Sequence, residues 1–330
     1  MENEFSEAAM FTNDMTLRQV LSQKEIAAIA PYAVKNFDLS AWPEYGKTLE
    51  ELGERHFGGD LIRGFTRLFK AAESGDWLYP LYTESACGAD PDKKSTNLLW
   101  LPSADPAADE RPYLLIVPGG GFVNVWNLTE GWPIADHMNA AGYHAFVLTY
   151  RVSCEGPVAV KEMEDVARAI EVIRENAAHF RVKWDRYAIC GFSAGGFITC
   201  LWSAGRNGYL KYGMPKPIAA VPVYPFVSHA MDGEAEFSKQ LFGCGPDETY
   251  ERGFEPQADA VNFPPAAIFV SAGDELVPPA HSRLLKQSLE EAGIPVYCEE
   301  GQGGYHGFAG GEGMNMEGWP ERMLGWLESL

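Results

Sequence analysis

Residues 187–205 read YAICGFSAGGFITCLWSAG, and this stretch decides the fold class. Its first four residues are apolar and of strand length, and its last nine are apolar with a spacing that suits a helix. Ser193 lies between them, so the stretch predicts a strand, a tight turn and a helix with a serine at the corner. The small residues Gly191, Gly195 and Gly196 let strand and helix approach closely. Taken alone, the pattern also fits a glycine-rich turn that carries no chemistry.

Further apolar runs of strand length lie on both sides of this corner. They span residues 114–117, 144–150, 219–224, 267–272 and 296–299, with helical patterns between them. The clearest helical pattern covers residues 160–180, where Met163, Val166, Ile170 and Ile173 form an apolar stripe. Strands that alternate with helices predict an α/β fold with a mostly parallel sheet and helices on both faces. Two earlier runs, residues 78–82 and 98–101, predict an antiparallel hairpin.

The first 77 residues carry no strand signal. A capping-box pattern at Ser22–Glu25 predicts the start of a short helix, and residues 47–57 and 61–72 predict two more. We expect two parts, a helical N-terminal extension over residues 1–77 and a catalytic domain over residues 78–330, with the extension packed over one end of the sheet. Whether the extension acts as a lid or joins two copies of the chain in a homo-oligomer stays open.

Composition excludes several classes of function. The 330 residues include 26 Lys and Arg against 46 Asp and Glu, a net charge of −20 that repels nucleic acid and anionic membranes. The first residues lack a signal-peptide pattern and the six cysteines form no C-x-x-C pair, so we expect a cytoplasmic protein with free thiols. We find no H-E-x-x-H motif and no other His/Cys cluster with metal-ligand spacing, so we expect no metal and no cofactor.

A glycine run, PGGGF at residues 118–122, follows the predicted strand 114–117 directly. It lacks the third glycine of a dinucleotide-binding fingerprint, and the only G-K-T has Ala41 where a P-loop needs glycine. Upstream of a G-x-S-x-G serine, such a run supplies backbone N–H groups for an oxyanion hole. We therefore predict Gly120 and Gly121 as donors, together with the N–H of Ala194.

A serine nucleophile needs a histidine to take its proton and an acid to orient that histidine. Downstream of Ser193, Asp274 ends the predicted strand 267–272, and His306 follows the next strand in a glycine-rich loop, GQGGYHGF. We predict these two as partners, with Glu275 and then Asp232 as rival acids. The other six histidines fit less well. His56, His137, His144 and His179 precede Ser193, His229 precedes the predicted acid, and His281 falls in a predicted helix.

The four motifs PGGGF, GFSAGG, GDELVP and GYHGF, in that order, resemble the α/β-hydrolase superfamily. They are most similar to its esterase/lipase group, including carbohydrate acetyl esterases and their feruloyl-esterase-like relatives, over roughly residues 78–330. The resemblance implies Ser193 as nucleophile, His306 as general base and then acid, Asp274 as orienting acid, and Gly120, Gly121 and Ala194 as oxyanion donors. Pro118 stands where lipase-type members carry histidine, which is closer to the sugar acetyl esterases.

The substrate is predicted from aromatic residues near these motifs. Phe122, Trp126, Tyr224 and Tyr305 are expected to stack on a sugar ring or line an acyl pocket, with ordinary core positions as the alternative. We predict a serine carboxylesterase that hydrolyses short-chain acyl esters, above all acetyl esters. Oligosaccharide esters are the leading substrates, and esters of another alcohol stay open. Two alternatives stay open: an amide hydrolase with the same triad, such as an arylformamidase or small peptidase, and a binding protein that has lost the chemistry.

Overall fold

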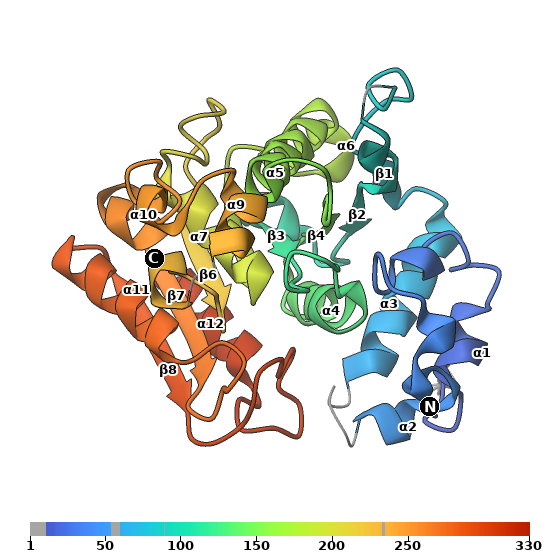
Figure 1. The fold of residues 1–330 in the computed structure, drawn as a ribbon. Helices are drawn as coiled ribbons and strands as arrows, with labels where there is room; N and C mark the ends of the chain where they lie inside the picture. Colours follow the sequence, from blue (N-terminus) through green and yellow to red (C-terminus); the bar gives the residue numbers. More distant parts are fainter. Residues whose placement is uncertain (1–10, 54–59, 89, 233–234) are drawn as a thin grey trace.

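The computed structural model describes residues 11–53, 60–88, 90–232 and 235–330 (Figure 1). In this part of the chain the strands form one mixed sheet of eight strands in the order β1-β2-β4-β3-β5-β6-β7-β8. Strand β2 is antiparallel to both neighbours, and the pairs from β4 to β8 are parallel. The predicted hairpin, parallel sheet and α/β-hydrolase fold class are confirmed. The strands are β1 Leu78–Pro80, β2 Asn97–Leu101, β3 Tyr113–Val117, β4 Ala145–Thr149, β5 Tyr187–Phe192, β6 Ala219–Val223, β7 Ala266–Ser271 and β8 Val296–Gly301.

Helices cover both faces of the sheet. Helices α4 and α12 share a core with one face, and α5, α7 and α11 pack on the other. The predicted helix over residues 160–180 is present as α5 and α6. Among the described residues, none of the helices has both the length and the apolar content to cross a bilayer. The bounds are α4 Trp132–Ala140, α5 Val158–Glu175, α6 Ala177–Phe180, α7 Ala194–Ala204, α8 His229–Asp232, α9 Ala235–Phe242, α10 Pro246–Thr249, α11 Ala280–Glu291 and α12 Trp319–Glu328.

The N-terminal part is helical, but its first helix starts elsewhere than predicted. Its helices are α1 Leu17–Leu21, α2 Leu49–Leu52 and α3 Asp60–Ser74. The predicted start at Ser22 is wrong, because the Ser22 amide and hydroxyl both donate to Arg18 O and thereby end α1. The capping boxes are those of Thr16 with Gln19 and Thr48 with Glu51. Of the helix predicted over residues 47–57, α2 is the described part, and residues 54–57 lie outside the described residues.

The N-terminal residues share their core with the sheet domain. Side chains of α1 and α3 belong to the same buried cluster as those of α4 and the sheet face beneath it. Arg63 and Arg67 on α3 each form an ion pair of 2.9 Å with Asp136 on α4. In Figure 1 α3 lies beside α4, near the β1 end of the sheet, and α1 lies on the outer side of α3.

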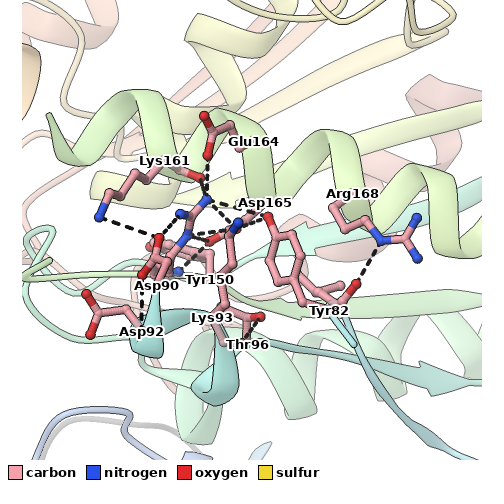
Figure 2. A network of polar contacts seen from close by, with 12 residues as sticks. Tyr82, Asp90, Asp92, Lys93, Thr96, Tyr150, Lys161, Glu164, Asp165 and Arg168 are labelled. Atoms are coloured by element: carbon pink, nitrogen blue, oxygen red, sulfur yellow. Dashed lines mark hydrogen bonds and ion pairs between the residues drawn. The ribbon is translucent and has the colours of Figure 1, made fainter. Parts of the chain in front are cut away.

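A polar network fixes the chain between β1 and β2 against α5 (Figure 2). Arg151, just after β4, donates to Asp165 at 3.0 Å and to Asp90 at 2.7 Å. The hydroxyl of Tyr82 donates to Asp165 as well, at 2.6 Å. Because Arg151 is 1% exposed, its charge has to be matched by carboxylates, and it forms ion pairs with Asp90, Glu164 and Asp165.

Candidate active site

Ser193 occupies the corner between β5 and α7 in a strained backbone conformation. Its φ of 53° and ψ of −116° are sparsely populated for a residue with a side chain, and its amide donates to Val223 O at 3.0 Å. A Cβ at Gly195 would collide with the carbonyl oxygens of Val117 and Pro118 at the end of β3. The glycine at this position is therefore required by the close approach of helix α7 to the neighbouring strand.

Ser193, His306 and Asp274 are joined by hydrogen bonds. Ser193 Oγ lies 2.8 Å from His306 Nε2, and His306 Nδ1 lies 2.7 Å from Asp274 Oδ2. The other Asp274 oxygen accepts from the amides of Leu276 and Val277 at 3.1 and 2.8 Å. An ionised carboxylate only accepts, so Nδ1 carries the proton and Nε2 is free to accept from the serine hydroxyl. This is the tautomer that a general base toward Ser193 needs.

The rivals for these positions lie elsewhere. Glu275 is exposed to solvent. His281 falls inside α11 as expected, and its buried Nδ1 accepts from the amides of Val227 and Ser228, both at 3.2 Å. His56 and the side chain of Asp232 lie outside the described residues.

The glycine loop, residues 118–126, places backbone amides beside Ser193. Gly120 and Gly121 have φ values of 139° and 62°, and a Cβ at Gly120 would collide with the backbone of Asn124. The carbonyl of Gly120 is turned back to accept from the amides of residues 123 and 124. Gly120, Gly121 and Ala194 all line the cavity at Ser193, and no hydrogen bond joins their amides to another described residue. These three amides are therefore the candidate donors to an anionic oxygen in this cavity.

A cavity of about 530 Å³ opens at Ser193 and His306. Its apolar wall includes Phe122, Phe226 and Phe237, and the Phe122 ring contacts the other two. Trp126 and Tyr305 line the cavity as predicted, and Tyr305 is 44% exposed at its mouth. Among the described residues that line the cavity, none is Lys or Arg.

Tyr224 does not line this cavity, contrary to the prediction that it contacts substrate. Its ring is 1% exposed and packs edge-on against His306, with ring centres 4.8 Å apart. Its hydroxyl donates to Glu130 at 2.8 Å and accepts from the amide of Ala309 at 3.2 Å. Because both hydrogen bonds are internal, the side chain is held beneath the histidine and away from the substrate.

Glu130 lines the cavity and was not predicted from the sequence. It lies in a π-helical turn, Asn127–Gly131, and is 7% exposed. Its Oε2 accepts from the amide of Gly119 at 2.6 Å, while burial raises the pKa of the carboxyl above its ordinary value. One sequence signal could have pointed to Glu130: it is an acidic residue within an apolar segment directly after the glycine loop. An acidic residue in such a segment is seldom buried without a polar partner.

Comparison with known proteins agrees with this fold. Residues 99–214 match the BD-FAE family. The chain is 27% identical over 220 residues to endo-1,4-beta-xylanase B of Butyrivibrio fibrisolvens, and 26% identical over 227 residues to an acetylxylan esterase of Xylanibacter ruminicola. These matches cover 64% and 65% of this chain but only 34% and 45% of the two relatives.

A solved structure has the same fold. It is the acetyl ester-xyloside bifunctional hydrolase from Caldicellulosiruptor lactoaceticus, which superposes with a TM-score of 0.61 at 24% identity. The match covers 76% of this chain and 95% of that chain, so about a quarter of the present chain has no counterpart there. The chain therefore has the fold of the α/β hydrolases, and its residues 99–214 match the BD-FAE family.

Proposed function

We propose that this protein is a serine esterase that removes short acyl groups, above all acetyl, from carbohydrate esters. The observation that carries the proposal is the continuous hydrogen-bonded chain from Ser193 through His306 to Asp274, which opens onto an apolar cavity. The proposed roles are nucleophile for Ser193, general base and acid for His306, and orienting carboxylate for Asp274.

The proposed reaction has two halves. Ser193 Oγ attacks the ester carbonyl while His306 Nε2 takes its proton, and the oxyanion is bound by the amides of Gly120, Gly121 and Ala194. His306 then gives the proton to the departing alcohol as the bond between the acyl carbon and that oxygen breaks. Water attacks the acyl-enzyme, again losing a proton to His306, and the carboxylic acid leaves as Ser193 recovers its proton.

The carbohydrate part of the proposal has separate support. The matched relatives are named for xylanase and acetylxylan esterase activity, and the superposed structure for an acetyl ester-xyloside hydrolase. The cavity lining has no Lys or Arg among its described residues, which disfavours anionic substrates, and the net charge of −20 acts in the same direction. Trp126 and Tyr305 offer aromatic faces near the mouth, where the alcohol part of the ester would lie.

The test compares esters of graded acyl length with real sugar esters. We expect hydrolysis of p-nitrophenyl esters to fall from acetate to decanoate, and acetate to be released from acetylated xylo- and manno-oligosaccharides. Ser193→Ala should lower kcat by several powers of ten and abolish labelling by a fluorophosphonate, with an unchanged circular dichroism spectrum. Near-normal turnover by Ser193→Ala would refute the assignment. Labelling of the wild-type protein without cleavage of any ester would point instead to amide substrates.

A further inference from the structure

Glu130 is hydrogen-bonded to one loop beside Ser193 and is linked through Tyr224 to a second. One is the glycine loop, residues 118–126, and the other is the histidine loop, residues 302–311. We propose that Glu130 is a positioning residue that holds both loops against Ser193 and places a negative charge beside His306. The proposal rests on the proposed function and adds a fourth polar group to its machinery.

The contact with the glycine loop is direct. Glu130 Oε2 accepts from the amide of Gly119, the residue before the two proposed oxyanion donors, at 2.6 Å. A Cβ at Gly119 would lie 2.9 Å from Ser193 Cβ and 3.0 Å from Glu130 Oε2, so this glycine is packed between the two side chains. The carboxyl therefore sets how closely the start of the glycine loop approaches the serine.

The contact with the histidine loop passes through Tyr224. Glu130 Oε1 accepts from the Tyr224 hydroxyl at 2.8 Å, and that hydroxyl accepts from the amide of Ala309 at 3.2 Å. The Tyr224 ring also packs against the rings of His306 and Phe308, with centres 4.8 and 4.6 Å away. One buried carboxyl thus spans segments that are far apart in the sequence, and each of its oxygens is used by a different loop.

The charge of Glu130 matters because His306 becomes an imidazolium when it takes the serine proton. Burial opposes the ionised carboxyl, whereas the Gly119 and Tyr224 hydrogen bonds and the attraction to His306 favour it. The titratable groups that face Glu130 are His306, Tyr224 and Tyr150. Burial raises the pKa of both tyrosines well above its ordinary value, so neither titrates in an assay between pH 5 and 9.

The experiment measures kcat, KM and the pH profile of kcat/KM for p-nitrophenyl acetate. Glu130→Gln keeps the shape of the side chain and removes its charge. We expect kcat to fall roughly 10- to 100-fold with KM within about threefold, because the loss lies in positioning and in the transition state. We also expect the acid limb of the profile to move to lower pH by about half a unit or more, since loss of the negative charge disfavours the protonated imidazole.

Tyr224→Phe separates the two roles. It keeps the ring and the Glu130 carboxyl but removes the hydrogen bonds to Glu130 and Ala309, so kcat should fall while the acid limb moves less than in Glu130→Gln. Tyr113→Phe is its matched control, because Tyr113 is also fully buried and its hydroxyl donates to Trp184 O at 2.9 Å, at the opposite end of the strands. Glu162→Gln is the control for replacing a buried carboxyl, as another fully buried glutamate outside the cavity. Both controls should keep wild-type kcat and pH profile.

The outcomes are distinguishable from failure of the proposed function. A wild-type protein that cleaves no ester and takes no fluorophosphonate label refutes the esterase itself. An active wild type matched by Glu130→Gln within threefold, or an acid limb that does not move, overturns the positioning role alone. If Glu130→Gln is insoluble, the comparison of Tyr224→Phe with Tyr113→Phe decides, and equal kcat values for the two overturn the proposal.

Discussion

At the scale of single residues, the assignment of the acid is open to a direct test. Asp274 and Glu275 are adjacent in the chain, yet Asp274 is 4% exposed and bonded to His306 whereas Glu275 is exposed. Asp274→Asn should lower kcat for p-nitrophenyl acetate by roughly 10⁴-fold, because an amide donor favours the wrong histidine tautomer. Glu275→Gln is the matched control and should leave kcat within about twofold. Equal effects of the two substitutions would contradict the assignment.

Sequence reasoning predicted that Ser193, Asp274 and His306 lie together, and they are hydrogen-bonded in the structure. Each ends or follows a strand in a fixed chain order, which a sequence displays directly. The same reasoning missed Glu130 and misplaced Tyr224 for a physical reason. Tyr224 follows β6 at the active edge of the sheet, but its φ of 36° and its hydrogen bonds to Glu130 and Ala309 turn the ring beneath His306. Side-chain direction in a loop depends on tertiary partners that a one-dimensional pattern does not contain.

At the scale of elements, the N-terminal segment 32–37 lies against the glycine loop. Main-chain hydrogen bonds run from Lys35 N to Val125 O at 3.0 Å and from Leu128 N to Ala33 O at 2.8 Å. The left-handed Asn36, with a φ of 60°, turns the chain so that Phe37 and Trp42 contact the cavity residue Trp126. The N-terminal residues therefore support the active-site loop in addition to covering the sheet.

Asn124 tests this support. Its side-chain amide donates to Lys35 O at 3.2 Å and to Asn36 O at 3.1 Å. Asn124→Ala should lower the free energy of unfolding by about 1–2 kcal/mol and also lower kcat several-fold, since the glycine loop loses a support. Asn207→Ala is the control, because its amide makes a similar pair of bonds to Arg252 O and Gly253 O. Urea unfolding should show comparable losses of unfolding free energy for the two variants. A kcat decrease in Asn207→Ala alone would contradict the argument.

The strands were predicted to within one or two residues because buried parallel strands form short apolar runs bounded by glycine and polar turns. The start of the first helix was predicted at the wrong residue. Ser22–Glu25, Thr16–Gln19 and Thr48–Glu51 all fit a capping-box pattern, and only the last two begin helices. Burial of Leu17, Val20 and Leu21 fixes the place of α1, and this packing leaves Ser22 at its end. Local pattern proposes a helix start, whereas tertiary packing selects among the candidates.

At the scale of the whole molecule, the acidic chain buries opposite charges where the N-terminal part meets α5. Lys35 is 4% exposed, its Nζ donates to Tyr150 O at 2.5 Å, and burial lowers its pKa to about 8. Glu162 on α5 is fully buried, and neither of its carboxyl oxygens has a hydrogen-bond partner among the described residues. Burial, with the nearby charge of Asp165, raises the pKa of Glu162 well above its ordinary value.

This arrangement predicts how stability changes with pH. A carboxyl whose pKa is higher in the folded than in the unfolded protein binds more protons when folded, so stability falls as pH rises above about 4.5, by at most about 1.4 kcal/mol per pH unit. Glu162→Gln removes that titration. The variant should therefore gain stability relative to wild type as pH rises from 5 to 7.5, a range below the pKa of Lys35 near 8.

Urea unfolding of both proteins at pH 5.0, 6.0 and 7.5 checks this, because the general charge repulsion of the chain is nearly the same in both and cancels in the difference. A difference that grows with pH identifies Glu162 as a buried acid that costs stability once ionised. A difference that stays constant over this range would mean that folding does not raise the pKa of Glu162, and the prediction would be wrong.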